Sequence, residues 1–102
     1  MKPIYIFQIN MSRTVKIMIS NDFVKPLLLS LEPWGEDYTL KVNETVEIIA
    51  NDCSEDFYFH IAPKTDYWAV YAEGSGNDYP RVYSNGIEVD CGYNRDLTDE
   101  IK

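Results

Sequence analysis

Apolar and polar residues alternate along most of this chain, in short segments separated by turn residues. In residues 14–20, Val15, Ile17 and Ile19 fall on one face of an extended chain, and the residues between them fall on the other. A repeat of two residues is the period of a β-strand, and β-branched and aromatic residues, which pack well on a pleated surface, fill these segments. The alternation therefore predicts an all-β fold. The predicted strands are residues 14–20, 27–32, 38–42, 45–50, 57–61, 67–73, 81–83 and 87–89.

The same alternation predicts which side chains face the core, and the residues between segments predict the turns. Asparagine followed by glycine at residues 85–86 is the strongest short-range hairpin signal, and residues 43–44 predict a second tight hairpin. The predicted inward residues of the second to sixth strands are Leu27, Leu29, Leu31, Tyr38, Leu40, Val42, Val46, Ile48, Ala50, Phe57, Phe59, Ile61, Trp68, Val70 and Ala72.

The regular spacing of short strands and turns favours one β-sandwich domain. We expect about seven to eight strands in a single-domain β-sandwich of the cupredoxin-like or immunoglobulin-like kind, with a small barrel as the alternative. The 102 residues suit one domain rather than two. Residues 1–12 are a candidate N-terminal extension, because Met11 could be the natural start. Residues 95–102 form a C-terminal tail, of which residues 97–102 could be helical.

Acidic residues dominate the charge. Seventeen Asp and Glu against nine Lys and Arg give a net charge of −8, and sixteen of those acids lie in residues 32–102. Such a field repels phosphate backbones, which argues against nucleic acid as a partner. No apolar run approaches the roughly 20 residues that span a bilayer, so we expect no membrane association and a cytoplasmic location. The acidity indicates either plain solubility or a surface that attracts a basic protein.

Few residues are available for metal or catalytic chemistry. A blue-copper site takes two histidines and a cysteine, and structural zinc takes four ligands, whereas the chain offers His60, Cys53 and Cys91. The acidic stretches at 51–56 and 77–78 lack the spacing of a calcium loop. We therefore expect no enzyme, no catalytic residue, no cofactor and no metal. Two cysteines make no disulfide framework here, so we expect both to be reduced and partly buried, although a bridge between them stays open.

An acidic residue, a proline and a tryptophan end the second predicted strand at residues 32–34. The proline ends the strand because it fixes φ and removes a hydrogen-bond donor. Trp34 then either folds over the end of the sandwich as a plug or stands exposed as an anchor. In the second case Glu32, Glu36 and Asp37 form an acidic rim around it, the arrangement of a binding hot spot.

Tyrosine is unusually frequent, with eight residues in a chain that is 14% aromatic. Tyr58, Tyr67 and Tyr71 fall on the strand faces opposite the predicted core residues. They either cover an outer sheet surface or form a protein-binding patch, because tyrosine gives a large contact area at a low entropy cost.

Residues 21–48 and residues 85–86 contain several short motifs that follow one another in a particular order. They are Asn21, Pro26-Leu27-Leu28-Leu29, Glu32-Pro33-Trp34-Gly35, Tyr38-Thr39-Leu40, Glu44-Thr45-Val46-Glu47-Ile48 and Asn85-Gly86. Together they resemble a set of small bacterial proteins that form one-domain, cupredoxin-like β-sandwiches with an acidic-Pro-Trp segment. The resemblance covers about residues 13–92. It implies a fold and no activity, because that family carries no agreed function.

These observations favour a non-enzymatic acidic module that binds another protein, for example an immunity or inhibitor protein of a basic partner. A second hypothesis is a small-ligand or carbohydrate binder, in which Trp34, Trp68 and Tyr67 form a concave patch at one end of the sandwich. A third is self-association through a strand edge, so we expect a monomer or a weak homo-oligomer. The candidate binding residues are Glu32, Trp34, Glu36, Asp37, Tyr58, Tyr67 and Tyr71.

Overall fold

The computed structural model of this chain describes residues 13–74 and 79–100. These residues form eight β-strands and one short 3-10 helix, and no α-helix is present among them. None of their helical residues makes a helix long and apolar enough to cross a membrane. The elements are β1 (Arg13–Ser20), β2 (Leu27–Glu32), β3 (Glu36–Leu40), β4 (Thr45–Cys53), β5 (Tyr58–Pro63), β6 (Trp68–Glu73), β7 (Arg81–Ser84), β8 (Ile87–Val89) and η1 (Arg95–Glu100).

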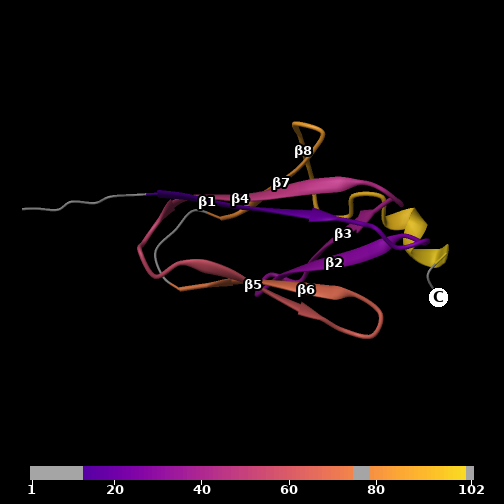
Figure 1. Cartoon of the computed structure of the whole chain (residues 1–102), viewed down its shortest axis with the longest axis horizontal. Helices are drawn as coiled ribbons and strands as arrows, with labels where there is room; N and C mark the ends of the chain where they lie inside the picture. Colours follow the sequence, from indigo (N-terminus) through magenta and orange to yellow (C-terminus); the bar gives the residue numbers. More distant parts are fainter. Residues whose placement is uncertain (1–12, 75–78, 101–102) are drawn as a thin grey trace, which may run out of the picture.

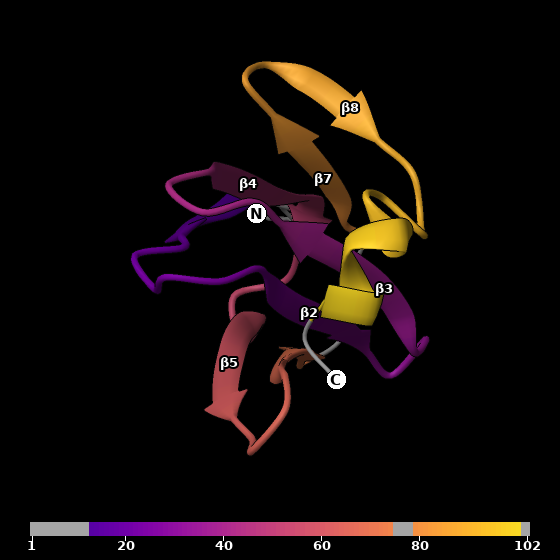
Figure 2. The ribbon, with the colours of Figure 1, turned by 90° about the vertical axis from the view of Figure 1, so that its right-hand side faces the viewer.

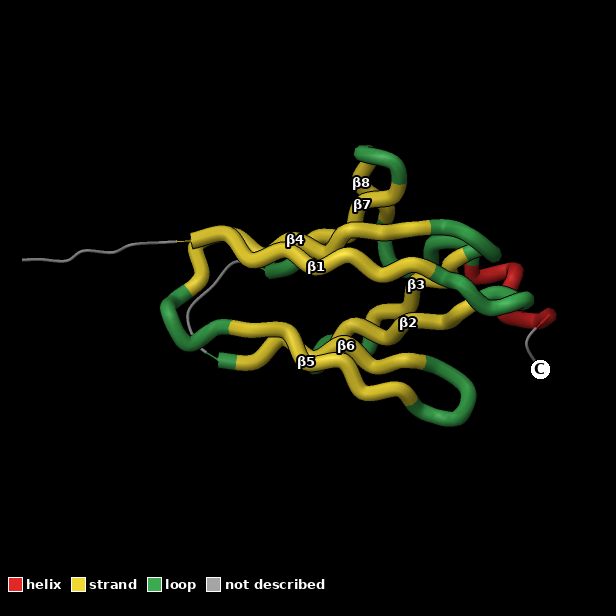
Figure 3. Tube along the Cα trace, in the orientation of Figure 1, coloured by secondary structure: helices red, strands yellow, loops and turns green. Residues whose placement is uncertain are grey.

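The strands form two four-stranded sheets that face each other as two layers (Figures 1 and 3). Sheet A has the strand order β1-β4-β7-β8, and sheet B has the order β3-β2-β6-β5. Neighbouring strands are antiparallel except for β2 and β6, which run parallel. The predicted β-sandwich is confirmed, and these strands do not close into the barrel that was the alternative.

Most of the predicted strands are present with bounds that shift by a few residues. β2 and β8 begin and end where the alternation places them, whereas β6 begins one residue later than predicted and β4 continues to Cys53. The β7–β8 hairpin is also confirmed. Its two turn residues, Asn85 and Gly86, have φ angles of 54° and 80°, and such a two-residue turn matches the right-handed twist of the flanking strands. The candidate extension at residues 1–12 lies outside the described residues.

The predicted hairpin at residues 43–44 is wrong, because β3 and β4 belong to different sheets. The chain leaves sheet B after Leu40 and crosses to sheet A, so Val42 is exposed instead of facing the core. The buried side chain of Asn21 explains the crossing. Its Nδ2 donates to the carbonyls of Leu40 and Lys41 at 3.2 and 3.1 Å, which holds the chain away from sheet B where β3 ends.

The core lies between the sheets and consists mostly of the predicted inward residues. A smaller cluster extends it toward the connection from β4 to β5, where Ala50, Cys53 and Phe57 are buried. Ile61 departs from the prediction, because it lies on the edge strand β5 and is exposed. The buried residues of the main cluster are Ile19, Leu27, Leu29, Leu31, Tyr38, Leu40, Val46, Ile48, Val70 and Val82.

The chain after β8 returns to sheet B and runs along the edge strand β3. The amide of Gly92 donates to the carbonyl of Asp37 at 2.7 Å, and the amide of Thr39 donates to the carbonyl of Tyr93 at 2.9 Å. The helix η1 follows and packs beside β3, as the yellow segment of Figure 2 shows. The edge of β3 is therefore hydrogen-bonded by this C-terminal segment, whereas β5 forms the other edge of sheet B.

Candidate functional site

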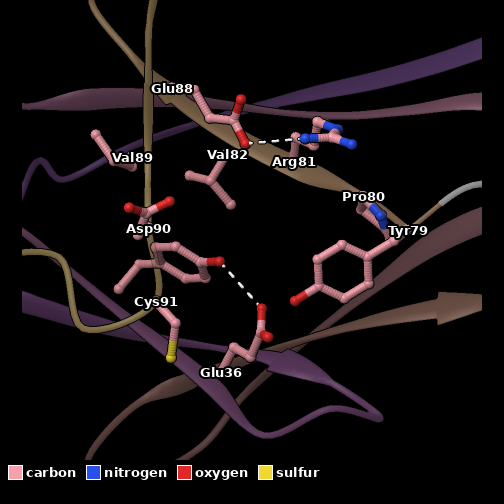
Figure 4. A pocket seen from close by; sticks show the side chains of 10 residues that line it. Glu36, Tyr79, Pro80, Arg81, Val82, Glu88, Val89, Asp90 and Cys91 are labelled. Atoms are coloured by element: carbon pink, nitrogen blue, oxygen red, sulfur yellow. Dashed lines mark hydrogen bonds and ion pairs between the residues drawn. The ribbon is translucent and has the colours of Figure 1, made fainter.

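An open cavity of about 320 Å³ lies between β3 of sheet B and the β7–β8 hairpin of sheet A (Figure 4). We call it the acidic cleft. Residues of β3 form the wall on the side of sheet B. Residues of β7, β8 and the segments just before and after this hairpin form the wall on the side of sheet A. The residues that line the acidic cleft are Glu36, Tyr38, Tyr79, Pro80, Arg81, Val82, Glu88, Val89, Asp90 and Cys91.

Carboxylates outnumber cations in this cleft. Glu36, Glu88 and Asp90 line it together with a single guanidinium. Arg81 Nη1 lies 3.3 Å from Glu88 Oε2, so one carboxylate is paired. Neither of the other two carboxylates forms an ion pair with any residue in the described part of the chain. The acidic cleft therefore offers two uncompensated negative charges to a ligand.

A tyrosine hydroxyl orients one of these free carboxylates. Tyr38 Oη donates to Glu36 Oε1 at 3.2 Å. Burial of the Tyr38 ring, together with the nearby Glu36 charge, raises the pKa of the Tyr38 hydroxyl far above its ordinary value, so the hydroxyl stays protonated as a donor. Figure 4 also shows the side chains of Glu36 and Tyr79 pointing toward one another. The Tyr38 hydroxyl thus fixes the Glu36 carboxylate in the lining of the cleft.

Trp34 flanks the acidic cleft. It lies in the turn between β2 and β3, after the cis Glu32–Pro33 peptide bond, and 41% of its surface is exposed. Its ring meets the ring of Tyr79 edge to face, with centroids 4.9 Å apart. Trp34 therefore contacts a residue that lines the cleft, although it is not part of the lining itself. This partial exposure fits an anchor better than a plug.

Asp37, a predicted rim residue, is engaged elsewhere. Its carboxylate accepts from Nη2 and Nε of Arg95 at 2.6 and 3.0 Å, and the thiol of Cys91 donates to it at 3.6 Å. The hydrogen bond from the Arg95 guanidinium lowers the pKa of Asp37 below its ordinary value. Asp37 thus fastens the C-terminal segment to β3 and is not part of the acidic cleft.

Three predicted binding residues share the outer face of sheet B instead. The register pairs Tyr58 with Glu73 on the neighbouring strand, and pairs Tyr71 with both His60 and Glu32. His60 Nδ1 lies 3.7 Å from Glu73 Oε2, and the rings of His60 and Tyr71 are 5.7 Å apart. The prediction did not include this histidine or Glu73. Their position opposite the core face of β5 and β6 was the signal that could have found them.

The aromatic residues of the ligand-binding hypothesis do not form one patch. Tyr67 and Trp68 line a second cavity, near the start of β2, because Trp68 pairs with Leu29 on the parallel strand. Trp34 lies beyond the far end of β2. The two tryptophans therefore occupy separate sites.

Both cysteines are free, and their environments differ. Cys53 is buried, whereas Cys91 is exposed, so the expected partial burial of Cys91 is wrong. Cys91 lies two residues after β8 and lines the acidic cleft, and its sulfur contacts the side chains of Asp37 and Arg95 at 3.6 and 3.8 Å. The described residues also contain no group of three or more His, Cys, Asp or Glu that could hold a metal ion.

This contrast predicts the thiol reactivity of the folded protein. Under native conditions we expect iodoacetamide to modify Cys91 within minutes and Cys53 only upon unfolding, because alkylation requires access to the sulfur. Intact-mass spectrometry would show one added group per chain without urea and two with urea. Cys91→Ser should show none in its folded state. Equal labelling of both thiols in the native protein would contradict the buried position of Cys53.

Sequence reasoning identified Trp34 and Glu36 but missed most of the acidic cleft. Tyr79, Glu88 and Asp90 belong to it because the β7–β8 hairpin lies across from β3, and no local pattern reveals that neighbourhood. The available signal was the asparagine-glycine hairpin at residues 85–86, with charged residues on both of its strands. No family model, curated protein or solved structure matches this chain.

Proposed function

We propose that this protein is a non-enzymatic binding module for a basic protein, and that the acidic cleft receives a lysine or arginine side chain of that partner. One observation carries the proposal: Glu36 and Asp90 line a cavity of about 320 Å³ without an ion-pair partner in the described chain. A cation that enters the cleft would interact with two carboxylates, and the hydroxyl of Tyr38 already orients the carboxylate of Glu36.

The flanking rings add a second attraction for such a cation. Trp34 and Tyr79 present aromatic surface at the edge of the acidic cleft. A guanidinium or ammonium group is attracted to the faces of such rings, by roughly 0.5–1 kcal/mol at exposed sites. A guanidinium also matches a carboxylate with two parallel hydrogen bonds. Trp34 would then be the anchor of the interface, as its partial exposure allows.

The charge of the whole chain supports the same partner class. A net charge of −8 attracts a basic surface from a distance and raises the association rate at low ionic strength. An immunity or inhibitor protein that neutralises a basic toxin has this character, and we propose that role as the most specific form. The cytoplasmic location and the likeness to cupredoxin-like proteins stay predictions.

A comparison of three baits tests this proposal. The wild-type chain, the cleft variant Glu36→Gln/Asp90→Asn and the control variant Asp22→Asn/Glu55→Gln would be immobilised and exposed to lysate of the source cells. Both variants remove two negative charges, and the control residues are exposed and lie outside the acidic cleft. We expect basic proteins that the wild type and the control retain and the cleft variant loses. Raising the salt concentration should release them, because salt screens the charges.

Either of two results would overturn the proposal: no protein retained above an empty resin, or the same proteins retained by the cleft variant and the control. Trp34→Ala should also lose these proteins while it stays folded. Its free energy of unfolding, measured with urea, should fall by about 1–2 kcal/mol, because the variant loses the contact with Tyr79 and the partial burial of the ring. Removal of a fully buried ring would cost about 3–5 kcal/mol instead. A loss in the larger range would mean that Trp34 is a plug.

A further inference from the structure

A second cavity, of about 270 Å³, lies at the end of the sandwich opposite the turn that carries Trp34. It is formed where the loop between β1 and β2 meets the turn between β5 and β6, at the right-hand end of Figure 3. We call it the end cavity. The residues that line it are Phe23, Lys25, Pro26, Leu27, Leu28, Lys64, Thr65, Asp66, Tyr67 and Trp68.

Aromatic and aliphatic side chains make up much of the wall. The ring of Phe23 meets Trp68 edge to face, with centroids 5.9 Å apart, although Phe23 is half exposed. An exposed phenylalanine held in a defined ring contact beside a cavity offers apolar surface to a ligand. Tyr67 adds a third ring to the lining. A planar apolar group is therefore the best match to this wall.

Hydrogen bonds fix the two loops that carry these side chains. Asn21 accepts from the amide of Phe23 at 2.9 Å and donates to the carbonyl of Lys25 at 2.9 Å. Across the cavity, the amide of Lys64 donates to the carbonyl of Tyr67 at 2.7 Å. Both backbones are thus set before any ligand arrives, which lowers the entropy cost of binding.

The charge of the end cavity is opposite to that of the chain. Two of its lining residues, Lys25 and Lys64, are cations against the single acid Asp66. Neither lysine forms an ion pair with any acid among the described residues. In a protein with a net charge of −8, two unpaired lysines beside three aromatic rings single out this cavity.

We propose that the end cavity binds a small aromatic carboxylate. The ring would lie against Phe23 and Trp68, and the carboxylate would accept hydrogen bonds from the ammonium groups of Lys25 and Lys64. Asp66 in the same lining repels a second negative charge, so a monoanion fits better than a doubly charged phosphate ester. This site is separate from the acidic cleft and does not depend on the proposed protein partner.

Titration of the full chain with 1-naphthoate, followed by amide shifts in ¹H–¹⁵N NMR spectra, tests this site. We expect saturating shifts at Phe23, Lys25 and residues 64–68 by about 10 mM ligand, a concentration that saturates a site with a millimolar Kd. Residues of the acidic cleft should not shift. Uncharged 1-naphthamide and doubly charged 1-naphthyl phosphate should each bind at least about threefold more weakly, which corresponds to one exposed ion pair.

Single variants that each remove one positive charge distinguish the local effect of the two lysines on binding from the effect of the protein's overall charge. Lys25→Gln and Lys64→Gln should each raise the Kd for 1-naphthoate about threefold, and the double variant about tenfold. Lys16→Gln, on the exposed face of β1, should leave the Kd unchanged. The proposal is overturned if shifts stay linear or scatter over the surface, if the amide binds as tightly as the carboxylate, or if the phosphate binds more tightly. Equal effects of Lys16→Gln and Lys64→Gln would also overturn it.

Discussion

Asn21→Ala should lower the free energy of unfolding by about 3–4 kcal/mol, because this substitution removes a fully buried side-chain amide and leaves in place the backbone groups that were hydrogen-bonded to it. Asn21 has no exposed surface. The two hydrogens of its Nδ2 are shared among three backbone carbonyls, which lie 2.9–3.2 Å from the nitrogen, and its Oδ1 accepts from the amide of Phe23. In the variant the carbonyl of Lys41 keeps the amide of Glu44, which donates to it at 3.0 Å, whereas the other three backbone groups lose the hydrogen bond that Asn21 makes. Each buried group left unpaired costs about 1–3 kcal/mol unless water reaches it.

Urea denaturation followed by circular dichroism would measure this loss. Asn51→Ala is the matched control, because Asn51 is exposed and its side chain accepts a single hydrogen bond, from Thr14. We expect the control to lose no more than about 1 kcal/mol. A loss below about 1 kcal/mol for Asn21→Ala would show that water or a shifted loop satisfies the orphaned carbonyls, and that Asn21 does not hold the crossing between the sheets.

The position of Asn21 also shows where sequence reasoning ends for this chain. Alternation located the strands because side-chain period is a local property, and Leu27–Glu32 and Ile87–Val89 follow it residue for residue. The connection between β3 and β4, residues 41–44, is as short as a hairpin loop, so local reasoning pairs the two strands. Hydrogen bonds from a side chain about twenty residues earlier direct the chain to the other sheet instead.

The residues predicted for the candidate site lie at separate places in the structure for the same reason. Trp34 and Glu36 belong to one turn and its following strand, so proximity in sequence was enough to group them. Neighbours in sequence alternate between faces, however, and Asp37 consequently points to the opposite side of β3, where it meets Arg95. The rest of the acidic cleft comes from β7, β8, the two residues before β7 and the two residues after β8, and their approach to β3 is a property of the packed sheets.

Glu44→Ala should lower the free energy of unfolding by about 2 kcal/mol at neutral pH. Glu44 lies on the connection between the sheets, and its Oε1 accepts from the amide of Lys41 at 2.8 Å. Its Oε2 accepts from the hydroxyls of Ser84 on β7 and Tyr93 on the C-terminal segment. One carboxylate thus joins three segments of the chain. Hydrogen bonds to a charged group contribute about 1.5–3 kcal/mol each when buried, and the partial exposure of Glu44 reduces that total.

The same carboxylate should make part of this stability depend on pH. Partial burial opposes ionisation of Glu44, but the hydrogen bonds from Ser84, Tyr93 and the Lys41 amide outweigh it, so the pKa of Glu44 lies below its ordinary value of 4.5. A pKa that is lower in the folded than in the unfolded state stabilises the fold above the unfolded pKa. This contribution is lost as the pH falls through the folded value.

Glu44→Gln should therefore be less stable than the wild type at pH 7, and the difference should shrink as the pH falls below about 4.5. Urea midpoints between pH 7 and about pH 3 would measure it. Some acid sensitivity should persist in the variant, because Asp37 also has a lowered pKa through Arg95, and Asp37→Asn/Glu44→Gln should remove most of it. A constant difference between wild type and Glu44→Gln over this range would show that the hydrogen bonds of Glu44 do not favour its charged form. The contribution of the Glu44 carboxylate to stability would then not depend on its charge, and the deficit of the glutamine variant would be the same at every pH.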